Sequence, residues 1–103
     1  MTIASTLAAG MAGHARLALL RLLNEQPGYV ANDSVLTDAL ELVGLPTTRA
    51  QVVAHLEWMA EVGLVSLLRP SPTLVVATAT ERGCDVARGR AMVSGVARPS
   101  AGN

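Results

Sequence analysis

The stretch that decides the fold is TTRAQVVAHLEWMAEVGLVSLLRPSPTLVVATATERG, Thr47–Gly83. Its first part places apolar residues at helical spacing, at Val52, Leu56, Met59 and Ala60. Two short runs of aliphatic and β-branched residues follow, LVSLLR and TLVVATA, with PSP between them. The stretch therefore predicts a helix that ends at Gly63, a β-hairpin, and the start of another helix.

The two helices of this stretch carry start signals of their own. Thr48 is followed three residues later by Gln51, which is the capping-box pattern. Thr80 is placed to cap a last helix over about residues 81–90. Between the helices, Pro70 and Pro72 prevent further strand pairing at the tip of the hairpin.

Two more helices are expected before this stretch. HARLALLRLLNEQPG predicts a helix over about residues 13–26, because leucines recur at helical spacing and Pro-Gly stops it. Residues 32–34 then offer N-cap side chains for a short amphipathic helix, which Gly44 and Pro46 end. The predicted fold is thus mainly α with a β-hairpin, in the order α-α-α-β-β-α.

The ends of the chain differ from its middle. Gly10 and Gly13 weaken any helix near the start, and the ending SGVARPSAGN is rich in Gly, Pro and Ser. We therefore expect an N-terminal segment over 1–12, a folded domain over 13–90, and a flexible tail over 91–103. The apolar surface of the first segment makes it a candidate for a homodimer interface.

The composition is that of one small folded domain. The chain has 103 residues, of which 50% are hydrophobic and 16% charged, so it differs from disordered chains. Its formal net charge is zero, and every basic residue is Arg. Because phosphate contacts supply most of the affinity for nucleic acids, DNA binders usually carry a basic surplus. Here only the part after Ser66 is basic.

Several functional classes are not expected. Cys84 is the only cysteine, so neither an internal disulfide nor a cysteine-rich metal site is expected. The chain shows no catalytic triad, paired-carboxylate motif or phosphate loop, so we expect no enzyme activity and no cofactor. The N-terminus lacks the basic start of a signal peptide, and no run reaches the length of a membrane span. We therefore expect a cytoplasmic protein.

Several short motifs resemble the arsenic-repressor type of the winged-helix family. These are RLALLRLL in the first helix, HLEWMAEVGLV across the end of the third, and ATERG after the hairpin. The pair His55-Leu56 and the triplet GLV at residues 63–65 match the family, and Met59 takes the place usually held by Leu. The resemblance covers about residues 13–90 and implies a winged helix-turn-helix.

The whole chain, including the ending RGRAMVSGVARPS, is also similar to small proteins of Mu-like phages and prophages. The winged-helix resemblance implies duplex DNA as the partner, a homodimer and a transcriptional regulator, and the phage resemblance implies the bacterial host cell as its location. The alternative is a winged-helix module that binds a phage protein in packaging or assembly and no longer contacts DNA.

The winged-helix resemblance also implies where DNA would bind, at the start and outward face of the third helix and at the hairpin tip. The candidate residues are Thr47, Thr48, Arg49, Gln51, His55 and Arg69. Gln and Arg are suited to base edges, and Arg also to phosphates.

Each candidate has an alternative reading. Thr48 and Gln51 could only cap the helix, and Arg69 could be a solubilising turn residue. Glu57 and Glu61 would repel phosphates if they faced DNA. Trp58 is expected to pack under the hairpin, or else to anchor a partner protein. The last-helix arginines could hold phosphates, bind an acidic neighbour, or complement the helix dipole; these are Arg82, Arg88 and Arg90.

Overall fold

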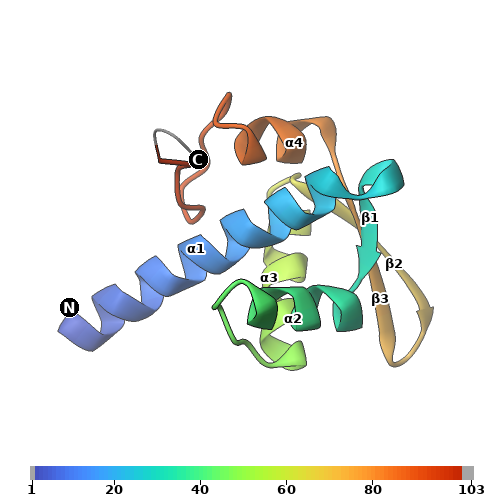
Figure 1. The fold of residues 1–103 in the computed structure, drawn as a ribbon, viewed down its shortest axis with the longest axis horizontal. Helices are drawn as coiled ribbons and strands as arrows, with labels where there is room; N and C mark the ends of the chain where they lie inside the picture. The colour runs from blue at the N-terminus through green and yellow to red at the C-terminus, as the bar shows by residue number, and fades with distance from the viewer. Residues whose placement is uncertain (1, 101–103) are drawn as a thin grey trace.

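The computed structural model of the protein describes residues 2–100 (Figure 1). In this part of the chain the helices are α1 (Ile3–Glu25), α2 (Asp33–Leu42), α3 (Arg49–Glu61) and α4 (Glu81–Ala87). One antiparallel sheet is formed by the strands β1 (Val30–Asn32), β2 (Val65–Ser71) and β3 (Leu74–Ala79). A 3₁₀ turn, η1 (Pro27–Tyr29), connects α1 to β1. The fold is therefore mixed α/β.

The predicted order α-α-α-β-β-α is incomplete, because it lacks strand β1, which lies between α1 and α2. β3 lies in the centre of the sheet, with β1 on one side and β2 on the other. Val30 lies opposite Thr78, and Asn32 opposite Val76. A run of three residues is too short for a strand pattern. β1 exists because β3, more than forty residues later, supplies its hydrogen-bond partners.

The hairpin also differs from the prediction, at its tip. β2 continues through Pro70 to Ser71, and the turn is at Pro72 and Thr73. The expectation that Arg69 stands at the tip is therefore wrong, because Arg69 lies within the strand. The register shifts between Leu68 and Ser71. Pro70, which has no N–H to donate, lies inside this irregularity.

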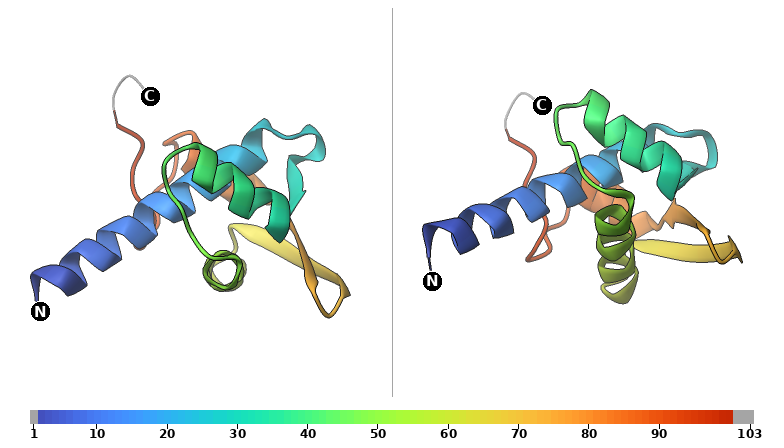
Figure 2. Two further views of the ribbon diagram at one scale, coloured as in Figure 1. Left: turned by 60° about the horizontal axis from the view of Figure 1, so that its bottom comes forward. Right: turned by 90° about the horizontal axis from the view of Figure 1, so that it is seen from below.

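Helix α1 begins ten residues earlier than expected. Thr2 caps it by accepting a hydrogen bond from the Ser5 amide over 3.1 Å. Gly10 does not interrupt the helix, because its neighbours are mostly Ala, Leu and Met, which favour helices. The N-terminal half extends away from the other elements, as the views of Figures 1 and 2 agree.

By length and composition alone, α1 is long and apolar enough to cross a membrane, although no such run is expected from the sequence. Core helices of soluble proteins share this property. The second half of α1 is of that kind, because Leu19, Leu20 and Leu23 are fully buried.

The core lies where α1, α2, α3 and the sheet meet. The largest fully buried apolar side chains come from the three helices and from the loop before β2: Leu19, Leu20, Leu23, Leu36, Leu40, Leu56, Met59, Leu64 and Val52. The sheet adds smaller buried residues, namely Val65, Val75, Ala77 and Ala79. Gly83 lets α4 approach closely, because a Cβ at this position would collide with the Leu64 carbonyl group. These contacts hold α2, α3 and the hairpin in one rigid arrangement.

Residues 91–100 differ from the expected flexible tail, since they fold back onto α1. The Ala97 amide donates a hydrogen bond to the Gly13 carbonyl over 3.1 Å, and Val96 is only 9% exposed. Gly95 has a φ of 98° and lies against the Trp58 ring, where a Cβ would be 2.8 Å from ring atoms. Residues 101–103 of the expected tail, and Met1 of the expected N-terminal segment, lie outside the described residues.

Candidate nucleic-acid interface

The structure places five of the six candidate residues on two surfaces. Arg49 and Arg69 line one hollow of about 410 Å³ between α3 and the hairpin. Thr47, Gln51 and His55 line another hollow, of about 400 Å³, between α3 and α1. The two arginines therefore lie together, while most of the other candidates face a different neighbour.

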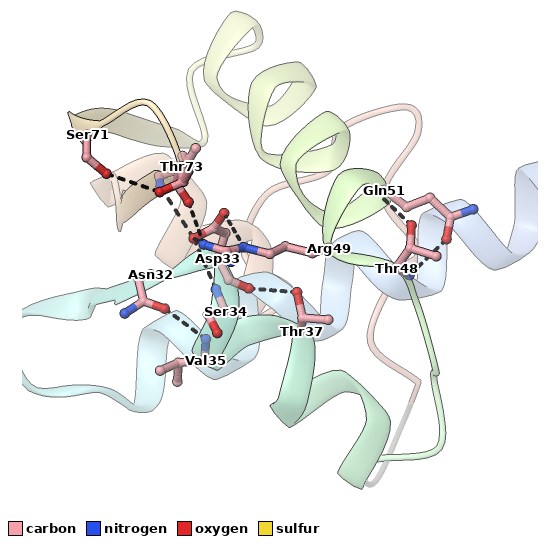
Figure 3. A network of polar contacts seen from close by, with 11 residues as sticks. Asn32, Asp33, Ser34, Val35, Thr37, Thr48, Arg49, Gln51, Ser71 and Thr73 are labelled. Atoms are coloured by element: carbon pink, nitrogen blue, oxygen red, sulfur yellow. Dashed lines mark hydrogen bonds and ion pairs between the residues drawn. The ribbon is translucent and has the colours of Figure 1, made fainter.

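The start of α3 forms the predicted capping box. The Thr48 hydroxyl accepts a hydrogen bond from the Gln51 amide over 3.1 Å, and the Gln51 side-chain oxygen accepts one from the Thr48 amide over 3.0 Å (Figure 3). Thr47 donates its hydroxyl proton to the Leu45 carbonyl over 2.8 Å. The polar groups at the start of α3 thus satisfy the local backbone.

Arg49 is engaged by a buried carboxylate. Its Nε and Nη2 donate to Asp33 over 2.9 and 3.2 Å, and Nη2 also donates to the Thr73 carbonyl over 2.6 Å (Figure 3). Asp33 is 1% exposed and also accepts from the amides of Ser34 and Val75, at 3.1 and 3.3 Å. One carboxylate therefore joins the start of α2, the start of α3 and the hairpin.

The electrostatics of this network favour the ion pair. Burial, the largest single influence, raises the pKa of Asp33, but Arg49 and the amides of Val75 and Ser34 together outweigh it. The pKa of Asp33 is consequently lowered. The hydrogen bond between Arg49 and Asp33 in turn raises the pKa of Arg49. Asp33 was not among the sequence candidates. Its only signal was its position beside the N-cap, where an acidic residue suits the helix dipole.

Arg69 is paired with an acidic residue of α3. Its Nη2 lies 2.7 Å from Oε2 of Glu57, and the two side chains are 49% and 52% exposed. Such an exposed pair contributes little to stability because solvent screens it. It does place a carboxylate directly beside the arginine expected to contact phosphate.

His55 belongs to a third cluster. Its Nδ1 accepts a hydrogen bond from Nε of Arg16 over 3.2 Å, and the Arg16 guanidinium lies 4.0 Å from the centre of the Trp58 ring. Arg16 also donates to the Gly95 carbonyl over 3.0 Å. Burial, followed by the charge of Arg16, lowers the pKa of His55, and burial lowers the pKa of Arg16.

Trp58 therefore has partners that differ from the expected hairpin. Its ring lies against Arg16 of α1 and against Gly95 of the C-terminal segment. A cation over an indole ring is a favourable arrangement, worth about 1 kcal/mol when partly desolvated. This contact helps to attach the C-terminal segment to α1 and α3.

The described residues offer little for metal chemistry. Within residues 2–100, no group of three or more His, Cys, Asp or Glu side chains is placed to hold a metal ion. The contacts that the candidate residues make are hydrogen bonds and ion pairs within the chain.

Comparison with known proteins places the chain among phage proteins. It is 43% identical over 84 residues to the uncharacterized protein gp26 of Escherichia phage Mu, and the match covers 82% of this chain and 85% of gp26. This chain belongs to the gp26 family. Membership in the gp26 family makes it a Mu-like phage protein.

A second relative of this gp26-family protein is an uncharacterized protein of Haemophilus influenzae, 42% identical over 67 residues. That match spans 65% of each chain, slightly less than two thirds of the relative's length. No family model matches the chain, and no solved structure matches it. The comparisons thus establish the gp26 family and leave activity to be argued from the residues.

Proposed function

We propose that this gp26-family protein is a protein-interaction module of Mu-like phages, built on a winged-helix framework, and that α3 does not read DNA. The observation that carries the proposal is that each of the six candidate side chains is hydrogen-bonded or ion-paired within the chain. Binding DNA through them would require these contacts to be broken first. On this proposal the partner is a protein of phage packaging or assembly.

The winged-helix part of the proposal is supported by the order of the elements. α2 and α3 follow one another across a short turn, the β2–β3 hairpin comes next, and β1 pairs on the other side of β3. This order is the one expected of a helix-turn-helix with a wing. The arsenic-repressor type is supported further by His55-Leu56 and the GLV triplet at residues 63–65.

The charges around α3 favour a protein partner. Glu57 and Glu61 are exposed on α3, and the chain has no net positive charge. In addition, Gln51 and His55 form one wall of a hollow whose other wall is the uncharged first half of α1. A surface of this kind offers a phosphate backbone little attraction.

Duplex DNA is the second candidate partner, with transcriptional regulation as its role. It is favoured by the shared hollow of Arg49 and Arg69, because each arginine is about half exposed and a phosphate could replace its carboxylate partner. The protein would then sit on DNA with α3 in the major groove and the hairpin along the backbone.

A salt-dependent assay with duplex DNA separates the two candidates. We expect no measurable binding at about 50 mM salt, because Arg49 and Arg69 beside α3 are already paired with Asp33 and Glu57. Binding with a clear salt slope, weakened by Arg69→Ala on all sequences and altered in sequence preference by Gln51→Ala, would overturn the proposal. Arg98→Ala, which changes an exposed arginine of the C-terminal segment, is the matched control.

A further inference from the structure

We propose that four arginines around the end of α4 bind an acidic segment of a partner protein. This inference rests on the proposed function, since it names the chemistry of the partner that the interaction module binds. The four residues are called the arginine surface and are Arg21 of α1, Arg88 and Arg90 after α4, and Arg98 of the C-terminal segment. The sequence alone leaves the role of Arg88 and Arg90 open, because it does not show what lies beside them.

The centre of the arginine surface is a hollow that Arg21 and Arg88 share. This hollow of about 500 Å³ lies between the ends of α1 and α4 and the C-terminal segment. Its lining residues are Arg21, Asn24, Glu25, Ala87, Arg88 and Pro99. In Figure 1 the C-terminal segment runs back from α4 towards α1. Two arginines that are far apart in the chain thus meet at one site.

The fold-back of the C-terminal segment brings Arg90 and Arg98 to the same place. Gly89 packs against the Pro99 ring, because a Cβ on Gly89 would lie 3.6 Å from Cγ of Pro99. Arg88 and Arg90 are the chain neighbours of Gly89, and Arg98 is the chain neighbour of Pro99. These three arginines are exposed. They therefore surround the hollow from its C-terminal side.

The side chains of the arginine surface have no partners in the described part of the chain. Within residues 2–100, the arginines that form ion pairs are Arg49 and Arg69. Arg16 is engaged by the cluster around Trp58. None of the four side chains of the arginine surface has such a contact in this part of the chain. Their guanidinium groups keep all of their N–H donors for an external acceptor.

The arginine surface is positive although the whole chain is neutral. Glu25 lines the hollow and Asp85 lies on α4, so four arginines stand against two carboxylates. Arg82 and Glu81, at the other end of α4, cancel each other. An arginine forms two parallel hydrogen bonds with a carboxylate, which fits its planar guanidinium group. The charge of this surface therefore complements Asp and Glu side chains of a partner.

The polar groups within the hollow favour a polypeptide over duplex DNA. Glu25 presents a carboxylate at the hollow, and Oδ1 of Asn24 is buried without a hydrogen-bond donor among residues 2–100. A polypeptide can supply N–H donors for these acceptors while its carboxylates meet the arginines. The backbone of DNA carries acceptors only, and it is bound through many phosphate contacts in long rows. Here the arginines gather around a single hollow.

Fluorescence anisotropy with a short fluorescein-labelled poly-L-glutamate peptide tests the inference. We expect binding at about 50 mM salt that weakens as the salt rises to about 500 mM, because salt screens exposed charges. Replacing Arg88 and Arg98 together by Gln should weaken binding by about tenfold. Both residues are exposed, so the circular dichroism spectrum should remain unchanged.

The matched control replaces Arg69 and Arg82 together by Gln. Both are exposed and lie outside the arginine surface, so this variant loses the same charge and should bind the peptide as the wild type does. Amide chemical shifts of the ¹⁵N-labelled chain then locate the peptide. The amides of Asn24, Arg88 and Gly89 should shift on addition of the peptide, and those of α3 should not.

Four outcomes would overturn the inference. The first two are no binding of the peptide at about 50 mM salt, and equal affinities of the Arg88/Arg98 variant and its control. The third is displacement of the peptide by duplex DNA of the same total charge, which would make the arginine surface a nucleic-acid surface. The fourth is self-association without peptide that the Arg88/Arg98 variant loses, which would make a second copy the occupant.

The peptide assay and the DNA assay depend on different residues. DNA binding that needs Arg69 and Gln51 overturns the proposed function, whereas DNA binding that needs Arg98 and not Arg69 overturns only the present inference. A peptide that does not bind leaves the proposed function as it stands. The two failures can therefore be told apart.

Discussion

At the scale of single residues, one buried carboxylate determines how the hairpin and the two central helices are joined. Asp33 is almost fully buried and receives hydrogen bonds from α2, α3 and β3. Leaving a buried charge without its partners is costly. Arg49 is therefore held in the fold, whereas the sequence suggested that it was free to contact DNA.

Replacing Asp33 by Asn should lower the free energy of unfolding by about 2 kcal/mol at pH 7, because the ion pair with Arg49 is lost. The folded pKa of Asp33 lies below its ordinary value of 3.8. The contribution is therefore present above about pH 4 and disappears as the pH falls through the folded pKa. Urea unfolding from pH 7 down to pH 2 measures the difference.

The matched variant is Asp38→Asn, which changes an exposed carboxylate of the same helix. It should alter stability by less than about 0.5 kcal/mol. Equal losses for the two variants at pH 7 would show that the Asp33 network does not contribute as described.

At this scale, contacts between near neighbours in the chain could be predicted from the sequence, whereas contacts between distant residues could not. The capping box of Thr48 and Gln51 was predictable because both partners lie within one helical turn. The pairs Asp33 with Arg49 and Arg69 with Glu57 join different elements. No spacing rule connects such residues before the elements are packed.

At the scale of secondary-structure elements, two glycines within helices have opposite roles. At Gly10 in α1, a Cβ would meet nothing within 4 Å beyond its chain neighbours and the backbone of its own helix, so the space is open. Gly83 in α4 lies directly against the backbone of Leu64. The first glycine only weakens its helix, while the second allows α4 to pack onto the core.

Gly10→Ala should therefore raise the free energy of unfolding by about 0.5–1 kcal/mol, because Ala favours a helix more than Gly does. Gly83→Ala should lower it by more than about 3 kcal/mol, because the collision is with backbone and α4 must move away. Urea titrations followed by circular dichroism compare the two variants. Effects of the same sign would contradict this account of the two sites.

The existence of the longer elements could be predicted, but not their limits. The spacing of apolar residues in the sequence predicts α2, α3 and the hairpin. The early start of α1 is not predictable from local propensity, because Gly10 and Gly13 lower the helix propensity of that segment. β1 is not predictable because a strand of three residues is too short to show an alternating pattern.

At the scale of the whole molecule, the cluster of Arg16, His55, Trp58 and Gly95 joins three segments that are far apart in the chain. Arg16 contacts each of the other three residues. The C-terminal segment is thereby attached to α1 and α3, in addition to the burial of Val96. Protonating His55 would place a second positive charge against Arg16.

The stability of the protein should consequently decrease as the pH falls below about 6.5. The folded pKa of His55 lies below its ordinary value of 6.5. The unfolded chain therefore takes up the proton first, and the contribution present above pH 6.5 is lost as the pH falls through the folded pKa. His55→Gln should reduce this loss, by no more than about 1 kcal/mol because the site is partly open to solvent.

Thermal unfolding at a series of pH values measures the effect, and the emission of Trp58, the only tryptophan, reports on the cluster. The exposed His14 provides the control, since His14→Gln should leave the pH dependence as in the wild type. A wild-type midpoint that does not change between pH 7 and pH 5 would contradict the prediction.

The sequence by itself determined the helical and strand periods, the capping signals and the membership in the gp26 family, because these depend on near neighbours or on overall similarity. Only the tertiary structure decided which polar groups are free. Whether Arg49, Arg69 or His55 can meet a partner depends on Asp33, Glu57 and Arg16, which folding brings to them from other elements. The same packing leaves the first half of α1 uncovered, because the core ends near Gly13.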